Sequence, residues 1–313
     1  HGPTGEILAM GSAPTFDPND LSRVDPDAIR NRAVTDTFEP GSTQKLITVA
    51  AALEEGVFRP GDVLEVPETI TIHDKEYKDV GEHPAQLTVA DIVTYSSNVG
   101  TILIQQELGN EKLHEYLDRF GFGQTSGLDF PGEAGGVLRE PQDWCETTCG
   151  ANTAIGYRVS VTALQMAAAY ATVANDGVWI QPHLIKEIVD ADGARRPFEP
   201  AKRPVISTKT AAQLRVMLEG VVDRGTGTNA EVDGYRIGGK TGTTKKYDPE
   251  LFYEHERVVA SFIGMGPIDD PEVVVAVVID TPGGGEFGGE VAAPVFAEIM
   301  AVALHQLGVP ADE

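Results

Sequence analysis

The last third of the chain most constrains its fold, because three strand-like segments follow one another there with turn signals between them. These segments are residues 235–244, 257–265 and 272–280. Successive strands with short links favour antiparallel pairing. Near the other end, residues 4–10 have the length and the apolar content of a further strand. We therefore expect an antiparallel sheet that is built from both ends of the chain.

The middle of the chain has mainly helical patterns. The predicted helices are residues 42–55, a segment that begins at 88, a second one through 106, and residues 112–120, 161–174, 208–222 and 292–307, with short strands at 64–75. This layout predicts an α+β fold in which helices cover the sheet. We expect one domain over residues 1–313, with a sheet subdomain of about 1–60 and 205–313 and an inserted, mainly helical subdomain of about 60–205.

The charge of the chain restricts its partners. Forty-eight acidic and 24 basic side chains give a formal net charge of -24. Such a surface repels nucleic acid and anionic lipid headgroups, so we expect no nucleic-acid partner. The longest apolar runs are much shorter than a membrane span, and no secretory signal is present. The chain opens at what reads as the middle of a strand, and we expect that preceding segments have been removed.

Three short motifs occur in order along the chain. They are S-x-x-K at residues 42–45, S-x-N at 96–98 and K-T-G at 240–242, and each occurs once. Each motif alone is a weak signal, but their settings agree. The first opens a predicted helix, the second lies between two helices, and the third lies on a predicted strand. Together they form the ordered triplet of a class of serine acyltransferases.

The first motif supplies a candidate nucleophile and its base. Ser42 and Lys45 are three residues apart on a helix, so they share a face. A serine hydroxyl needs a base within hydrogen-bond reach, and Lys45 is followed by a very apolar run that would desolvate its amine and favour the neutral form. The helix N-terminus also favours the negative charge of an attacking alkoxide. The alternative is that Ser42 is a simple helix cap and Lys45 a solvated side chain.

The second motif is predicted to move protons and hold substrate. Ser96 would bridge Lys45 and the leaving group as a proton shuttle, and Asn98 would bind an amide of the substrate. The alternative for both residues is an ordinary polar turn between two helices.

The third motif is predicted to bind the substrate along a strand. Lys240 would supply positive potential for a substrate carboxylate, and the hydroxyls of Thr241 and Thr243 would bind it. Gly242 would leave room for the substrate beside the strand edge. The backbone N–H groups of Ser42 and Thr243 are the candidates for the oxyanion site. The alternative for this segment is a strand end with a glycine bulge.

Other residues give little indication of a metal or a cofactor, and we expect neither. Cys145 and Cys149 are either two free thiols or a local disulfide, and a metal site there would need further ligands. None of the seven histidines lies in an H-E-x-x-H or G-x-S-x-G context. A zinc hydrolase or a Ser-His-Asp enzyme is therefore not indicated.

With these motifs in place, the chain resembles the transpeptidase domain of class B penicillin-binding proteins, most closely the septal division transpeptidase of actinobacterial type. The segments that carry the resemblance are TGEILAM with FDPND, EPGSTQKLITVAAALEEGV, YSSNVGTILI, LDRFGFGQTSGLDFPGE, VTALQMAAAYATVANDGV, RIGGKTGTTKK and GGEVAAPVFAEIM. They span nearly the whole chain. The resemblance implies the penicillin-binding and β-lactamase-like fold.

The resemblance also implies an activity, D,D-transpeptidation. The family's functional residues carry over at Ser42, Lys45, Ser96, Asn98, Lys240, Thr241, Gly242 and Thr243. The implied substrates are peptidoglycan stem peptides that end in D-Ala-D-Ala and an amine acceptor on a neighbouring strand, and β-lactams would acylate the same serine. Full-length relatives have an N-terminal membrane anchor and a pedestal domain, which places them at the outer face of the cell membrane with division proteins as partners.

The chain departs from the family pattern at three places. Related sequences usually have a second glycine after Gly156, where this chain has Tyr157 and Arg158, and often have proline at Ala163. The cysteine pair is also unusual. Two other functions stay open: a hydrolase of the same superfamily (a D,D-carboxypeptidase or a β-lactamase, although we find no E-x-x-L-N-like segment), and a non-catalytic β-lactam sensor or scaffold.

Overall fold

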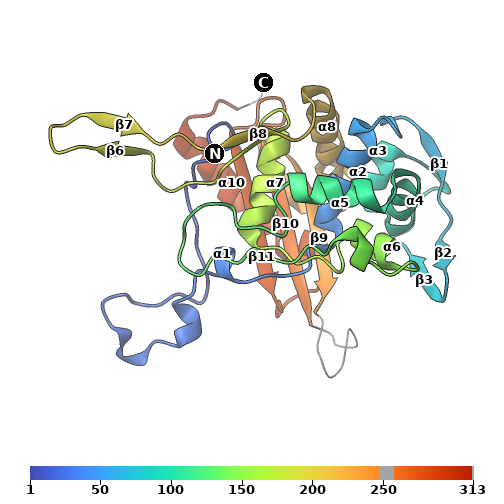
Figure 1. The fold of residues 1–313 in the computed structure, drawn as a ribbon, viewed down its shortest axis with the longest axis horizontal. Coiled ribbons are helices and arrows are strands. Elements are labelled where there is room, and N and C mark those ends of the chain that lie inside the picture. Colours follow the sequence, from blue (N-terminus) through green and yellow to red (C-terminus); the bar gives the residue numbers. More distant parts are fainter. Residues whose placement is uncertain (247–256, 312–313) are drawn as a thin grey trace.

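The computed structural model describes residues 1–246 and 257–311 and has a three-stranded antiparallel sheet at its centre (Figure 1). The strands are β9 (Gly238–Lys245), β10 (Val258–Gly266) and β11 (Val273–Asp280), in the order β11-β10-β9. The register is antiparallel throughout, with Lys240 opposite Ile263 and Ala260 opposite Thr243. The three strands expected in the last third of the chain are therefore present and pair as predicted.

Alternate side chains of the sheet enter two hydrophobic cores. Ile263 and Met265 of β10 lie in the larger core, whereas Phe262 lies in the smaller one, where it contacts the ring of Phe296 at 4.6 Å between centroids. Successive residues of a strand point to opposite faces, so β10 needs apolar residues on both. All nine of its residues are buried for this reason. The sheet is thus covered on both faces, by α7 on one and by α10 on the other.

Helices form most of the remaining regular secondary structure. Their bounds are α1 (Arg32–Thr35), α2 (Lys45–Glu54), α3 (Val89–Thr94), α4 (Asn98–Leu108), α5 (Asn110–Arg119), α6 (Cys149–Ala154), α7 (Ala163–Ala174), α8 (Thr208–Arg224), α9 (Gly288–Val291) and α10 (Ala293–Leu307). Short 3-10 turns lie at Leu21–Arg23, Pro26–Ala28, Gly41–Gln44 (η3), Pro141–Asp143 and Thr228–Ala230. In the part of the chain that the structure describes, no helix combines the length and the apolar character needed to cross a bilayer.

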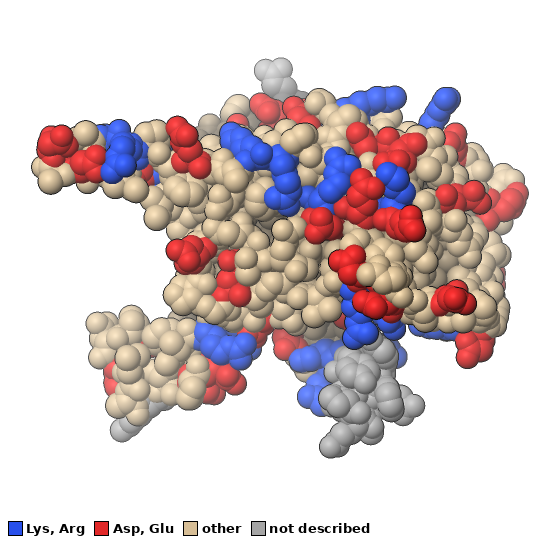
Figure 2. All heavy atoms as spheres, viewed as in Figure 1, with Lys and Arg blue, Asp and Glu red and all other residues tan. Residues whose placement is uncertain are grey.

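Among the described residues, eight short strands form four two-stranded ribbons around this body. β1 (Val63–Glu65) pairs with β4 (Gln86–Thr88), β2 (Thr69–Ile72) with β3 (Lys75–Lys78), β5 (Val178–Ile180) with β8 (Lys202–Pro204), and β6 (Glu187–Val189) with β7 (Arg195–Pro197). The β6–β7 hairpin extends away from the body (Figure 1). Figure 2 shows that acidic and basic side chains are mixed over the face drawn there.

The prediction of a strand at residues 4–10 is wrong. Thr4 and Gly5 close a turn onto His1, and only Glu6 forms an isolated bridge, with His183. Ile7 N–H donates to the His183 carbonyl at 2.9 Å, and Leu8 is 50% exposed. β-branched and apolar residues favour extended backbone but do not choose its partner. The central sheet of the described residues is therefore built from the C-terminal third alone, although the α+β class is confirmed.

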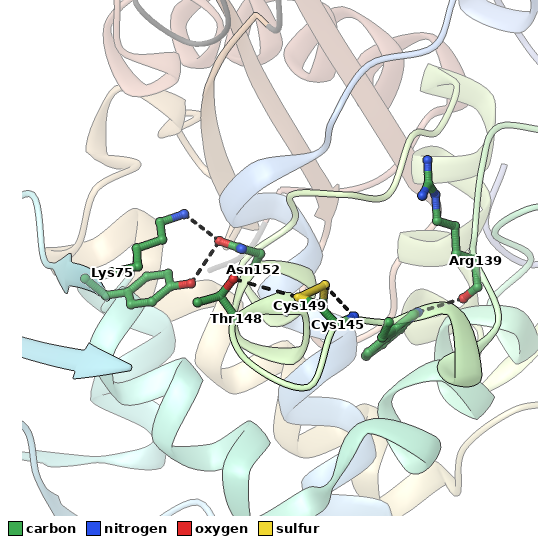
Figure 3. The surroundings of a disulfide bond; sticks show 8 residues. Lys75, Arg139, Cys145, Thr148, Cys149 and Asn152 are labelled. Atoms are coloured by element: carbon green, nitrogen blue, oxygen red, sulfur yellow. Dashed lines mark hydrogen bonds between the residues drawn. A yellow bond between two sulfur atoms is a disulfide. The ribbon is translucent and has the colours of Figure 1, made fainter. Parts of the chain in front are cut away.

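The two cysteines form a disulfide, which decides between the alternatives left open by the sequence. Cys145 and Cys149 are four residues apart and join the loop before α6 to its first residue. Figure 3 shows the bond beside Thr148 and Asn152. The Asn152 carboxamide oxygen accepts hydrogen bonds from Lys75 Nζ at 2.7 Å and from Tyr77 Oη at 3.1 Å. The disulfide thus fixes the start of a helix that is also tied to β3.

We expect reduction of this disulfide to lower the free energy of unfolding by about 2 kcal/mol, because so short a loop removes little entropy from the unfolded chain. Urea unfolding with and without a thiol reductant measures the change. A Cys145→Ala/Cys149→Ala double variant serves as the control and should not respond to the reductant. Equal stability of the native protein with and without the reductant would contradict the presence of the disulfide.

Candidate active site

Ser42 lies in η3, a tight turn that three neighbours hold in place. Gly41 N–H donates to the Gly156 carbonyl at 3.0 Å, and Tyr170 Oη donates to the Thr43 carbonyl at 2.9 Å. Gly41 has φ +55°, and a side chain there would meet Thr244 of β9. Ser42 does not cap α2: the residue before the helix is Gln44, and it makes no side-chain cap bond. The reading of Ser42 as a simple cap is therefore wrong.

The other side of the turn is covered by α6. Gln44 Nε2 donates to the Thr153 carbonyl, and Thr48 Oγ1 donates to the Ala154 carbonyl at 2.9 Å. Gly156 follows this helix at φ +86°, and an added Cβ would lie 2.1 Å from the Gly41 carbonyl oxygen. The chain between α6 and α7 therefore approaches the serine turn so closely that only glycine fits.

Lys45 is the first residue of α2, and its side chain is fully buried. Its Nζ donates to the Ser96 carbonyl at 2.5 Å and to Asn98 Oδ1 at 2.7 Å, and it lies 3.4 Å from Ser96 Oγ. The first two motifs, separated by about fifty residues of sequence, thus meet at one amine. Burial lowers the pKa of Lys45 to about 7, against an opposing attraction by Asp79.

The S-x-N segment is a strained turn that leads into α4. Ser96 has φ +59°, a conformation rare for residues other than glycine. Ser97 caps the helix, because its Oγ accepts from Gly100 N–H at 2.8 Å. The backbone thereby aims both the carbonyl and the hydroxyl of Ser96 toward Lys45. The Asn98 amide also donates from Nδ2 to the Lys78 carbonyl at 2.9 Å, which leaves Oδ1 for the amine.

The K-T-G segment lies on β9, the edge strand that contacts η3. Thr241 Oγ1 lies 2.8 Å from Thr226 Oγ1, and Thr243 Oγ1 accepts from Gly288 N–H at 3.0 Å. A Cβ on Gly242 would lie 2.9 Å from Thr43 Cγ2 and 3.2 Å from the Pro40 carbonyl oxygen. The sequence predicted that Gly242 leaves room for substrate, and the structure adds another reason: it lets β9 pack against the serine turn.

Lys240 is fully buried on the same strand. Its Nζ lies 3.3 Å from Thr241 Oγ1. Burial, together with the positive charge of Lys45, lowers the pKa of Lys240 well below its ordinary value. The charge of Lys45 therefore acts on Lys240, which ties the third motif electrostatically to the first.

A family model described as the penicillin binding protein transpeptidase domain matches residues 2–301. The chain belongs to this family. Stage V sporulation protein D of Bacillus subtilis is 42% identical over 97% of this chain and 48% of that protein. Peptidoglycan D,D-transpeptidase FtsI of Escherichia coli is 36% identical over 99% of this chain and 51% of that protein. The chain thus spans about half the length of these relatives.

Solved structures agree with this assignment. Penicillin binding protein 3 from Mycobacterium tuberculosis, complexed with aztreonam, has a TM-score of 0.92 and 36% identity, covering 100% of this chain and 72% of that one. The resemblance to class B penicillin-binding proteins is confirmed, and so is the α+β penicillin-binding fold.

Two of the departures from the family pattern have structural explanations. Arg158 adopts φ +65°, so an arginine takes a left-handed conformation close to the position at which the family pattern predicts a second glycine. Its N–H donates to Glu39 Oε1 at 2.7 Å, which anchors the loop to the segment before Ser42. Ala163 is the first residue of α7, a position where proline is also favoured.

Two residues beneath the site were not singled out from the sequence. Asp79 and His83 lie between β3 and β4, and both make hydrogen bonds next to the S-x-N turn. No local pattern marks them, because an acidic residue and a histidine in a polar loop are ordinary on a surface. Only the packing of the loop under α4 brings them to the site.

We expect Gly156→Ala to destabilise the protein by about 2–4 kcal/mol, because it combines an unfavourable positive φ with a clash against the serine turn. Gly193→Ala is the matched control: it has φ +85° but no atom within 4 Å of an added Cβ. It should cost only about 1–2 kcal/mol. Thermal unfolding measures both. Equal losses would show that the contact with Gly41 carries no energy.

Proposed function

We propose that this chain is the catalytic domain of a peptidoglycan D,D-transpeptidase that acts in septal cell-wall synthesis and is inhibited covalently by β-lactams. One observation supports it above the others. A buried lysine amine lies within hydrogen-bond reach of the S-x-N segment, beside a serine turn that packs against the K-T-G strand. The proposed cleft lies between the sheet subdomain of about 1–60 and 205–313 and the helical subdomain of about 60–205.

The proposed reaction has two acyl transfers. Ser42 Oγ attacks the carbonyl carbon of the penultimate D-Ala, and its proton passes to neutral Lys45. The proton then moves through Ser96 Oγ to the nitrogen of the terminal D-Ala as the peptide bond breaks. An amine of a neighbouring stem peptide attacks the resulting ester, gives up its proton to the same network, and restores the Ser42 hydroxyl.

The remaining residues have binding roles in this proposal. Asn98 would hold an amide of the donor peptide. Lys240 would supply positive potential for the terminal carboxylate of this peptide, and the hydroxyls of Thr241 and Thr243 would bind it. Gly242 would keep the strand edge open to the peptide. The backbone N–H groups of Ser42 and Thr243 would stabilise the oxyanion. These N–H groups belong to two segments that pack together, since the Cβ position of Gly41 is 3.5 Å from the Thr243 carbonyl oxygen.

The setting of the protein is part of the same proposal. The names of the relatives refer to a D,D-transpeptidase and to sporulation. We infer that the domain works at the outer face of the cell membrane, held by an N-terminal segment and a pedestal domain outside residues 1–313. Membrane proteins of the division machinery would be its partners, and stem peptides its substrates.

Labelling with a fluorescent penicillin tests the nucleophile and the base. The native protein should form a stable adduct on Ser42, located by mass spectrometry of peptides. Ser42→Ala should abolish labelling, and Lys45→Ala should slow it at least about 100-fold because no base remains. Lys202→Ala, on the exposed strand β8, is a control that should label normally.

Other outcomes would decide between the alternatives. Rapid loss of the adduct would indicate a hydrolase, and no labelling of the folded native protein would indicate a scaffold. A cross-linking assay with lipid-linked substrate separates a transpeptidase from a sensor, because only a transpeptidase joins two stem peptides.

The acylation rate should depend on pH through Lys45. A general base must be neutral, and the pKa of Lys45 is about 7, so the second-order rate constant should fall about tenfold per pH unit below that value and level off above it. Stopped-flow acylation by a chromogenic β-lactam gives the profile. A midpoint near the ordinary lysine value would mean that Lys45 is not the base.

A further inference from the structure

A buried carboxylate lies directly beneath the S-x-N turn. Asp79 follows β3, and its side chain is only 6% exposed. It accepts four hydrogen bonds: from Asn98 N–H, from Val99 N–H at 3.1 Å, from Ser97 Oγ at 2.7 Å, and from His83 Nε2 at 2.7 Å. The two backbone donors are the first N–H groups of α4. The carboxylate therefore fixes the start of this helix through its charge and its geometry.

The fourth donor, His83, is held in its charged form. Its Nδ1 lies 2.8 Å from the Pro84 carbonyl and its Nε2 lies against Asp79, while the side chain is only 5% exposed. A carbonyl and a carboxylate can only accept, so both ring nitrogens must carry a proton for both bonds to form. Burial opposes this charge, but the bonds to Pro84 and Asp79 outweigh it and raise the pKa of His83.

One residue connects this ion pair to the amine. The Asn98 backbone N–H binds Asp79, and the Asn98 carboxamide oxygen binds Lys45 Nζ. A displacement of the turn would therefore move a direct partner of the amine. The charge of Asp79 also acts on the amine, because it favours the protonated form of Lys45 against burial. His83 carries the opposite charge and binds the same carboxylate at 2.7 Å, so its charge opposes that of Asp79.

We propose that His83, acting through Asp79, is a positioning residue for the acylation step: its charge holds the carboxylate that fixes the S-x-N turn and limits the attraction that this carboxylate exerts on Lys45. The inference rests on the proposed function, since it concerns the same serine and the same base. Asp79 and His83 touch no substrate in this scheme. They act on the geometry and the protonation of residues that do.

Other charged groups around the two titrating residues restrict the interpretation of pH effects. Lys240, on β9, is a further cation near Lys45, because the charge of Lys45 lowers the pKa of Lys240. Glu68, between β1 and β2, is the further carboxylate that acts on His83. Neither is altered by the variants below, so changes between variants report on Asp79 and His83.

The two variants should shift the acylation profile in opposite directions. Asp79→Asn removes the negative charge that favours protonated Lys45. The rise of the acylation rate with pH should therefore occur at lower pH. His83→Gln leaves the charge of Asp79 without its opposing cation, so the attraction on protonated Lys45 increases. The rise of the acylation rate with pH should therefore occur at higher pH. Each shift should be about half a pH unit or more. The maximal rate should fall about tenfold or more in Asp79→Asn, because the turn loses its anchor.

A matched control uses another histidine–carboxylate pair. His114 on α5 lies 3.7 Å from Glu140, and His114→Gln should leave both the rate and the profile unchanged. Stopped-flow acylation by a chromogenic β-lactam, from about pH 5 to about pH 9, gives all the profiles. Shifts in the same direction for Asp79→Asn and His83→Gln, or no shift in either, would overturn the inference, because a purely structural loosening lowers the rate without opposed shifts.

A second measurement applies even where one variant folds poorly. The pKa of His83 is raised, so the stabilisation from the ion pair is complete below the ordinary imidazole value of about 6.5 and is lost as pH rises through the raised value. The melting-temperature difference between native protein and His83→Gln should be larger at about pH 6 than at about pH 9. An equal melting-temperature difference at the two pH values would show that His83 is not charged in the folded protein.

The outcomes separate this inference from the proposed function. If the native protein is not acylated at Ser42, the proposed function fails. If it is acylated normally and the variants behave like the His114→Gln control, only the role of His83 and Asp79 fails.

Discussion

The removal of the Lys45 amine from water is the interaction on which the site depends. An ammonium group inside a protein is costly unless it is paired and hydrogen-bonded, and here it has a carbonyl, a carboxamide and a nearby hydroxyl as partners. These partners hold the side chain in place, and within residues 1–246 and 257–311 no carboxylate forms a salt bridge with the amine that would hold its proton. The charge of Asp79 favours the protonated amine, but Asp79 is linked to Lys45 only through Asn98. Burial therefore wins, and the amine can give and take a proton near neutral pH.

This burial requires that three distant segments meet without side chains in the way. Gly41, Gly156 and Gly242 lie at the points of closest approach, and a Cβ at any of them would come within 3.0 Å of another group. The sheet supplies the rigid reference for the assembly, because β10 is buried on both faces and fixes the register of β9. The serine turn then rests between β9 and α6, which the disulfide and Asn152 tie to β3 (Figure 3).

The sequence predicted the regular elements well where local patterns are strong. The apolar runs of α2 and α7 and the three strands of the central sheet were found because periodicity and turn residues mark them. The prediction of a strand at residues 4–10 was wrong because an extended segment was assumed to join the central sheet. Its hydrogen bonds instead connect it to His183. The 3-10 geometry of η3 was missed as well, since glycine, serine and threonine before a helix fit a cap equally well.

The sequence by itself determined the motif residues, their order and the family, because these depend on residue identity and spacing along the chain. Tertiary structure alone decided which groups contact the Lys45 amine and how readily that amine loses its proton. The ion pair of Asp79 and His83 has no local signal, and it exists because the loop between β3 and β4 folds under the first turn of α4. Protonation inside a protein depends on neighbours in space, and a linear pattern does not contain them.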